Sequence, residues 1–341
     1  MSKREKIIGY IEDLIKNEQL KKGDKIPSEY TLAEMFSVNR TTANLAVSML
    51  VSKGLLKRFS GAAGTIVAKN GSYPKGTLTY LTSLGHNNDY WAKLLKGAQK
   101  AAFMRKYVLQ YTEYDPRDLK SLLAKLSDYG IKGLLTSCYG IISEKLPFPV
   151  VHVDAVPPEG TSYNYVTNDN FSSGHLITKH LLDLNHREIV FVGEVIDFNL
   201  PQIDERKDGF IKALEEVGIS NAESRIFHSN SNYATTLREI RSKYPGVTGI
   251  VFDSDSLSIR MMKFFIKNNI RVPDDISIVG CGALTRGMPT MKITSVEQFP
   301  EDMGFFACNA LVDLAEGKRT AAIAERLPVE LFPGESVQAL K

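Results

Sequence analysis

The 341-residue chain is predicted to be an α/β protein with an N-terminal winged helix-turn-helix domain and a bilobed domain of doubly wound parallel sheets. Three observations predict this fold. A helix-turn-helix pattern followed by a glycine-punctuated hairpin occupies residues 37–67. Beyond residue 76, strand and helix patterns alternate in the βαβ order that is typical of parallel sheets. The alternation runs over about 265 residues, which is more than one sheet usually needs, so we expect two lobes.

The predicted boundaries are residues 1–69 for the winged domain, 70–76 for a linker and 77–341 for the bilobed domain. The segment AKNGSYPKG at residues 68–76 contains two glycines, one proline and few apolar residues. Such a composition is typical of a connection between folded units.

Two helices are expected before the candidate recognition helix. The first is an amphipathic helix, and the glycine of Lys22-Gly23-Asp24 interrupts it. The second begins after Pro27, with Ser28 as its N-cap. A glycine at position 54 is placed to end the third helix, and Lys57-Arg58 then begins a strand. The apolar residues expected inside the first helix are Ile7, Ile8, Ile11, Leu14 and Ile15.

The third helix has one polar face and one apolar face. Arg40, Asn44 and Ser48 are four residues apart, so they share a side of the helix. The apolar stripe consists of Ala43, Ala46, Val47 and Leu50. A helix with a polar, cationic leading face can enter the major groove, where its first residues contact bases and neighbouring groups contact phosphates. The expected partner of this domain is therefore double-stranded DNA, although a small helical domain with an ordinary solvated face has the same spacing.

The charge distribution favours the DNA-binding interpretation. Residues 1–72 contain 12 Lys or Arg and 7 Asp or Glu, a net charge of +5, whereas the whole chain carries +3. The cationic excess is thus confined to the candidate DNA-binding domain, as expected when phosphate contacts release counterions.

Residues 4–69 resemble the winged-helix domain of the GntR regulators. The resemblance rests on the runs GDKIPSE (23–29), VNRTT (38–42), GLL (54–56) and Gly64-Thr65. Tyr30 and Asn44 stand where the family usually has arginines that contact DNA, so the operator sequence should differ from the common pattern. The expected DNA-binding residues are Ser28, Tyr30, Asn39, Arg40, Thr41, Thr42, Asn44, Arg58 and Gly61.

The predicted elements of the larger domain follow one another with short connections. Strands are expected at residues 77–82, 108–112, 133–137, 150–153, 189–192, 225–228, 249–252 and 277–279, and helices at 90–105, 119–126, 172–184, 205–217, 233–243 and 256–268. Ligands of open α/β sheets bind beyond the carboxyl ends of the strands. Two facing lobes should therefore form a cleft that can close on a ligand.

Several segments of residues 77–332 resemble the sensor domain of the LacI/GalR family, which is similar to periplasmic sugar-binding proteins. The matching runs are VTNDN (166–170), RKDGF (206–210), IRVPDDISIVG (270–280) and ITSVEQ (293–298). The resemblance implies a homodimeric repressor of carbohydrate-utilisation genes. It also implies that a sugar bound in the interlobe cleft releases the protein from its operator.

Sugar recognition needs polar groups that pair with hydroxyls and aromatic faces that cover the ring. The residues expected to bind the effector are Tyr90, Trp91, Asp154, Arg206, Tyr233, Asp255 and Gln298. All of them except Gln298 have a structural alternative: the aromatics could belong to the core, Asp154 to a turn, Arg206 to a surface ion pair and Asp255 to a helix cap.

Two departures from the family pattern concern the expected pocket. Ser254 replaces the usual asparagine, and Gly282 stands where a ligand-binding aspartate is common. The pocket should be larger or chemically different. The alternative function is a DNA-binding regulator whose sensor is degenerate or binds a small molecule other than a sugar.

Other functional classes find little support in the sequence. There is no Walker loop and no G-x-S-x-G motif, so an enzyme is not expected. Neither the histidines nor Cys138, Cys281 and Cys308 have metal-site spacing, and no metal or cofactor is expected. No apolar run approaches the roughly 20 residues of a membrane span, and the N-terminus lacks a signal-peptide core. We expect a cytoplasmic protein with reduced, buried thiols.

Overall fold

The computed structural model describes residues 3–59, 64–68, 74–83, 89–137, 142, 146–156, 163–194, 201–230, 232–289 and 291–341. The chain divides into two compact units, Met1–Gly76 and Thr77–Lys341. We call the first unit the head and the second the sensor domain. In the described residues, no helix is long and apolar enough to cross a membrane.

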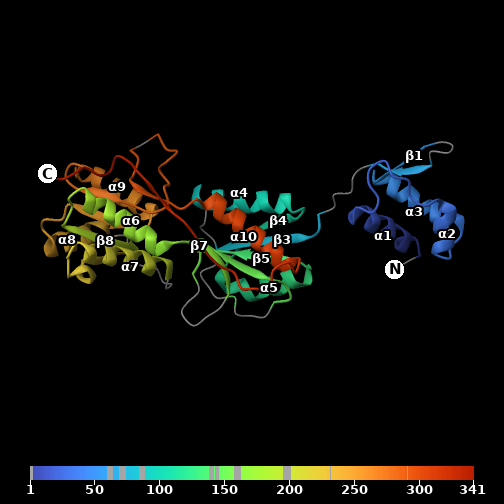
Figure 1. Cartoon of the computed structure of the whole chain (residues 1–341), viewed down its shortest axis with the longest axis horizontal. Helices are drawn as coiled ribbons and strands as arrows, with labels where there is room; N and C mark the ends of the chain where they lie inside the picture. Colours follow the sequence, from blue (N-terminus) through green and yellow to red (C-terminus); the bar gives the residue numbers. More distant parts are fainter. Residues whose placement is uncertain are drawn as a thin grey trace. The chain divides into compact units, whose positions relative to one another are not determined.

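The head consists of three helices and a two-stranded antiparallel hairpin (Figure 1). Its elements are α1 (Lys3–Lys16), α2 (Glu29–Met35), α3 (Arg40–Ser52), β1 (Leu56–Arg58) and β2 (Thr65–Val67). The predicted apolar stripes of α1 and α3 meet in one core with Leu32, Leu56 and Val67, except that Leu14 of α1 is half-buried and lies outside this core. Ser28 caps α2, Asn39 caps α3, and Gly54 follows α3 with φ of 71°. The predicted order of helix, turn, helix and hairpin is therefore confirmed.

The first lobe of the sensor domain contains a six-stranded parallel sheet with strand order β13-β7-β6-β5-β3-β4. Helices α4 and α10 cover one face of this sheet and α5 covers the other (Figure 1). The strands are β3 (Thr77–Ser83), β4 (Val108–Tyr114), β5 (Gly133–Thr136), β6 (Val150–Val153), β7 (Asn164–Asn168) and β13 (Ala324–Leu327). The helices are α4 (Asp89–Met104), η2 (Pro116–Asp118), α5 (Leu119–Asp128) and α10 (Pro300–Ala315).

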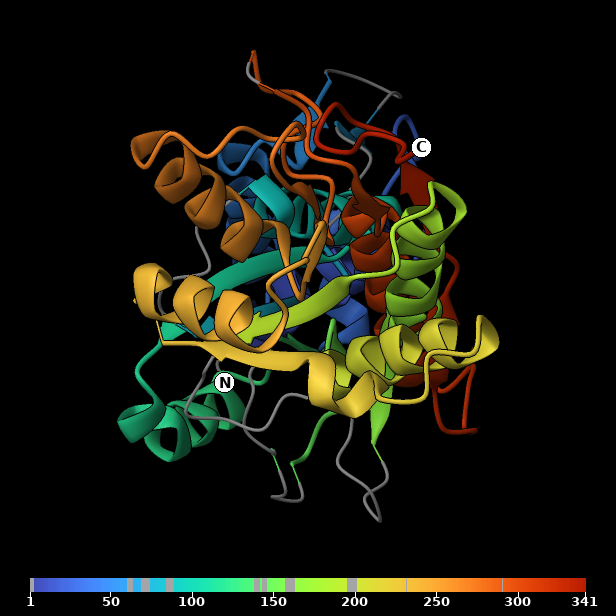
Figure 2. The same cartoon turned by 90° about the vertical axis from the view of Figure 1, so that its left-hand side faces the viewer.

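The second lobe contains a four-stranded parallel sheet with strand order β11-β10-β8-β9. Alternate residues of β8 and β10 belong to two cores, one formed with α6 and α7 and the other with α8 and α9. The helices of the two cores lie on opposite sides of the sheet (Figure 2). The strands are β8 (Ile189–Glu194), β9 (Ile226–Ser229), β10 (Gly249–Phe252) and β11 (Ser277–Val279). The helices are α6 (Asn170–Asp183), α7 (Pro201–Glu216), η3 (Ala222–Arg225), α8 (Tyr233–Lys243) and α9 (Asp255–Lys267).

The chain crosses between the lobes three times, because both lobes are built from segments that are distant in sequence. The first crossing connects β7 to α6, and the second connects β12 (Ser295–Glu297) to α10. The third connects β13 to β14 (Glu330–Phe332). Strands β12 and β14 pair in an antiparallel manner beside the second sheet. Domain closure around a ligand usually takes place at a few residues in loops or at the ends of elements, and these connections are segments of that kind.

Close helix packing supports both lobes. A Cβ atom on Gly174 of α6 would lie 1.9 Å from the backbone oxygen of Arg206 in α7, and one on Gly304 of α10 would lie 2.0 Å from that of Leu94 in α4. No side chain fits at such distances, so these glycines allow the backbones to touch. The contact of α6 with α7 fixes the position of Arg206.

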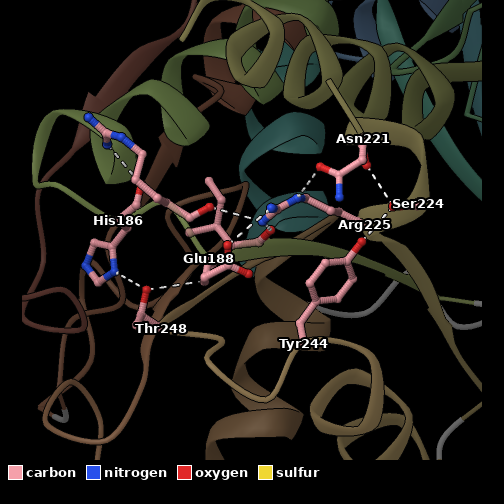
Figure 3. A network of polar contacts seen from close by, with 9 residues as sticks. His186, Glu188, Asn221, Ser224, Arg225, Tyr244 and Thr248 are labelled. Atoms are coloured by element: carbon pink, nitrogen blue, oxygen red, sulfur yellow. Dashed lines mark hydrogen bonds and ion pairs between the residues drawn. The ribbon is translucent and has the colours of Figure 1, made fainter. Parts of the chain in front are cut away.

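A buried polar network anchors the end of the chain and the edge of the second sheet (Figure 3). The ring nitrogens of His186 pair with Thr248 Oγ1 at 2.9 Å and with the carbonyl oxygen of Gln338 at 2.8 Å. Arg225 donates to the carbonyl oxygens of Arg187 and Ile189. These contacts satisfy buried groups within the fold, which assigns His186 a structural role.

The predicted parallel fold is confirmed, and several strands and helices, among them α8, β6, β10 and β11, have the predicted bounds. Four elements, β7, α10, β13 and β14, are additions to those predicted from the sequence. Of the three cysteines, Cys281 and Cys308 are free and buried, whereas Cys138 lies outside the described residues.

Candidate functional site

The exposed side of α3 carries the residues that were predicted to contact DNA. Arg40, Thr41 and Asn44 are exposed, and Ser48 Oγ lies 3.3 Å from Asn44 Oδ1, as expected for one helix face. Tyr30 on α2 is also exposed, with 64% of its surface accessible. These side chains form a polar face at the start of the recognition helix, which is where a helix-turn-helix contacts base edges.

Other predicted DNA-binding residues have clear structural partners. Asn39 Oδ1 accepts hydrogen bonds from the backbone N–H and the hydroxyl of Thr42, both at 2.8 Å. Ser28 Oγ accepts from Thr31 N at 3.1 Å. Arg58 forms an ion pair with Glu29 at 3.1 Å, which holds the wing strand against α2. Gly61 lies outside the described residues.

A small polar cavity lies between the two lobes of the sensor domain. Its volume is about 170 Å³, which is below the usual range for drug-sized ligands and suits a small molecule. The first lobe supplies residues of α4 and the end of β6, and the second supplies residues of α7, the start of α9 and the segment after β11. The lining residues are Tyr90, Trp91, Asp154, Arg206, Ser254, Asp255, Ser256, Cys281, Gly282, Leu284 and Gln298.

Three of these residues present buried polar atoms without a hydrogen-bond partner among the described residues. The atoms are Tyr90 Oη, Asp154 Oδ1 and Gln298 Nε2. The Tyr90 hydroxyl and the Asp154 carboxyl nevertheless lie near enough to interact with each other, since each shifts the pKa of the other. An unpaired buried polar atom costs roughly 1–3 kcal/mol, so such atoms are few in folded proteins. Their presence in one cavity points to a polar ligand that supplies both donors and acceptors.

Asp154 combines backbone strain with an unusual electrostatic setting. It follows β6 with φ of 54°, a left-handed conformation that costs free energy for a residue other than glycine. Burial raises the pKa of its carboxyl to about 6, against the lowering effect of the Arg206 guanidinium. Burial also raises the pKa of Tyr90, and the nearby Asp154 carboxylate adds to this increase. The strained backbone of Asp154 and the raised pKa of its carboxyl are both typical of a ligand-binding carboxylate.

Arg206 is held by the protein itself. Its Nε and Nη2 donate to Asn170 Oδ1 at 3.0 and 2.8 Å, and its Nη1 donates to the carbonyl oxygen of Asp253 at 2.9 Å. The guanidinium thus ties the start of α6 to the end of β10 at the cavity wall. From the sequence, the Arg206 guanidinium was expected to form a bidentate contact with the ligand. In the structure, its hydrogen bonds go to Asn170 and Asp253 of the second lobe.

Asp255 lines the cavity but is engaged on both carboxylate oxygens. Oδ1 accepts from Ser295 Oγ and Oδ2 accepts from Leu284 N, each at 2.7 Å. Burial raises the pKa of this carboxyl to about 6. The alternative in which Asp255 caps a helix is wrong, because Ser254 caps α9 by accepting from Leu257 N.

Six of the seven predicted effector residues line the cavity, and Tyr233 does not. Tyr233 packs edge-on against Phe264, and its hydroxyl accepts from Arg260 Nε at 3.1 Å. Cys281, Ser256 and Leu284 also line the cavity and were not predicted. Gly282 has φ of 126°, and a Cβ built there would lie 3.9 Å from Gln298 Oε1. The same Cβ would lie 3.8 Å from Leu284 Cγ, so the position is in ordinary van der Waals contact with its neighbours, and its positive φ disfavours an aspartate there.

Comparisons with known proteins agree with this architecture. Residues 3–67 match the bacterial regulatory proteins of the gntR family, and residues 178–337 match the periplasmic binding protein-like domain. The two matches thus give a head domain of the GntR type and a sensor domain like that of periplasmic binding proteins. An arabinose metabolism transcriptional repressor from Geobacillus stearothermophilus is 27% identical over 332 residues, covering 90% of this chain and 89% of the relative.

Solved structures show the same fold in the sensor. A complex of the transcriptional regulator CelR with cellobiose is 21% identical, with a TM-score of 0.65 over 91% of this chain and 100% of the other. A LacI family regulator from Enterococcus faecium with bound ribose is 21% identical, with a TM-score of 0.66 over 78% of this chain and all of the other. A GntR-type head on a LacI-type sensor was the arrangement that the sequence motifs predicted.

Proposed function

We propose that this protein is a cytoplasmic transcription regulator that represses carbohydrate-utilisation genes and leaves its operator when a sugar fills the interlobe cavity. The observation that carries the proposal is the convergence of Tyr90 Oη, Asp154 Oδ1 and Gln298 Nε2 in one cavity beside Trp91. A sugar hydroxyl can donate to the carboxylate and accept from the amide, and an indole can cover an apolar face of the ring.

The balance of charges favours an uncharged sugar. Two carboxylates, Asp154 and Asp255, and one guanidinium, Arg206, line the cavity. Because two of these three groups are acidic, a phosphate dianion would meet more repulsion than attraction. The effector class is accordingly a small neutral polyol, and sugar phosphates are disfavoured.

The regulatory mechanism follows from the two units. In the proposed homodimer, two heads contact the half-sites of a near-palindromic operator. The sugar must bind one lobe arrangement more tightly than the other, because equal affinity shifts no equilibrium. A difference of about 1–3 kcal/mol is the usual coupling between two such sites. The named arabinose repressors among the relatives support the repressor role. In this role the protein has no catalytic activity.

A thermal-shift screen of the full chain tests the proposed effector class. We expect a neutral mono- or disaccharide to raise the melting temperature, while the phosphate ester of the same sugar has little effect. At a ligand concentration of 100 times Kd, binding adds about 2.7 kcal/mol to stability. Tyr90→Phe should weaken this response, because it removes one cavity hydroxyl.

Tyr233→Phe provides the matched control, since it deletes the same hydroxyl outside the cavity and should leave the response intact. A shift with sugar phosphates alone would contradict the proposed ligand class.

The second candidate function, a regulator with a degenerate or non-sugar sensor, is favoured by Gly282 in place of the usual aspartate. This second function predicts that the affinity of the protein for its operator does not change when any sugar is added.

A further inference from the structure

Leu284 connects the two lobes at the cavity. It belongs to the second lobe by its position after β11, yet its half-buried side chain packs against the core that α4 and α10 form in the first lobe. Trp91 packs against that core as well, and both residues line the cavity. An apolar contact of this kind is available only while the two lobes are close together.

The backbone that carries Leu284 is held by Asp255. Leu284 N donates to Asp255 Oδ2 at 2.7 Å, and the preceding residue, Ala283, donates through its N–H to Ser295 Oγ at 3.1 Å. Ser295 Oγ in turn donates to Asp255 Oδ1 at 2.7 Å. One carboxylate therefore fixes two consecutive backbone N–H groups, directly and through a hydroxyl.

The turn needs this support because its backbone is strained. Gly282 and Ala283 have φ of 126° and 47°, and the second value is unfavourable for a residue with a Cβ atom. Position 280 beside the carboxylate has to be glycine, because an added Cβ would lie 2.2 Å from Asp255 Oδ1. The anchor and the turn are thus fixed to the second lobe, and Leu284 extends from them.

We infer that Leu284 is an interlobe contact held in position by Asp255, and that it sets how tightly the lobes close around the effector. This inference rests on the proposed function for the identity of the effector, although the contact itself involves only residues of this chain. Asp255 is then a positioning residue, whereas the sequence had placed it among the residues that contact the sugar. Leu284 acts by packing, because its side chain has no polar atom.

Amide hydrogen exchange of the ligand-free full chain tests the contact without any sugar. Leu284→Ala should increase exchange at least about fivefold at the start of α4 and in residues 281–285, because the lobes open more often. Leu284→Met, which keeps an apolar side chain of similar volume, should restore most of the protection. Ile219→Ala is the matched control, since Ile219 is a half-buried aliphatic residue that packs within the second lobe and lies after α7, away from the crossing strands. Equal exchange in Leu284→Ala and the wild type would overturn the inference.

A sugar titration then tests the role of Asp255. Leu284→Ala and Asp255→Ala should each raise the half-saturating sugar concentration at least about fivefold, at the low end of allosteric couplings. If Asp255 acts through Leu284, the double variant should resemble Asp255→Ala alone. Effects that multiply would show that Asp255 contacts the sugar independently and would overturn its positioning role. If no sugar binds the wild type, the proposed function fails while the exchange experiment still decides the contact.

Discussion

Replacing Asp154 with asparagine is expected to stabilise the ligand-free protein at neutral pH and to abolish its response to sugar. The carboxyl of Asp154 is buried, and its pKa of about 6 lies above the ordinary value of 3.8. Ionisation is therefore less favourable in the folded state than in the unfolded state. The ionised group costs folding free energy on the order of 2 kcal/mol, which asparagine of the same shape avoids.

The pH dependence gives the sign of this effect. Because the folded-state pKa is the higher one, the cost is absent below about pH 4, grows as the pH rises to about 6, and is fully present above that. We expect Asp154→Asn to raise the melting temperature by about 4–8 °C at pH 7.5 and by much less at pH 4. Thermal denaturation at both pH values measures the difference.

Loss of the sugar response has a separate cause. An asparagine amide presents one acceptor oxygen where the carboxylate presents two, and it carries no charge to strengthen a hydrogen bond from a sugar hydroxyl. Asp183→Asn is the control, because Asp183 is an exposed carboxylate of α6 paired with Lys179. A variant Asp154→Asn that is less stable than the wild type at pH 7.5, yet still responds to sugar, would show that the buried carboxylate serves the fold.

Replacing Arg40 with alanine is expected to weaken operator binding roughly 5- to 150-fold, the range of one good base contact. Arg40 is exposed at the first position of α3, beside the Asn39 cap. Its guanidinium forms no hydrogen bond or ion pair with the described residues. Its guanidinium is therefore available to DNA, whereas Arg58 is paired with Glu29. Arg40 provides the strongest single test of the recognition helix.

The measurement is a fluorescence-anisotropy titration with a duplex selected by the wild-type protein, repeated at several salt concentrations. Lys16→Ala is the matched control, since Lys16 carries the same charge on the exposed end of α1. If Arg40 contacts a base, its loss should relax sequence preference, and if it contacts phosphate, the salt slope should fall by about 1. If Arg40→Ala and Lys16→Ala bind the operator with equal affinity, the assignment of α3 as the recognition helix is wrong.

The sequence predicted most elements of the fold because their apolar residues repeat at a regular spacing. The buried runs of β6, β10 and β11 and the stripe of α8 are examples. Strand β13 was missed because it is an edge strand with three exposed residues and no apolar alternation. Helix α10 was missed although its sequence carries the helical signal, because its buried residues from Met303 to Val312 repeat every three or four positions. What the sequence does not show is that this stripe packs against α4, about 200 residues earlier in the chain.

The candidate site was predictable where a residue ends a strand or begins a helix. Asp154, Trp91 and Gln298 occupy such positions, and the parallel topology brings them together. Tyr233 also begins a helix, but its contacts with Phe264 and Arg260 keep it with α9. Leu284 could not be found from the sequence, because an apolar loop residue gives no sign that it packs against the other lobe.

Sugar-driven release of the full chain from its operator tests the central claim most directly. A labelled operator duplex bound by the wild-type protein would be titrated with the neutral sugar found in the thermal screen. We predict that the operator Kd rises at least about fivefold at saturating sugar, within the usual allosteric range, and stays constant for Asp154→Asn. An operator Kd that no sugar changes, in a protein whose cavity binds that sugar, would contradict the coupling between cavity and head.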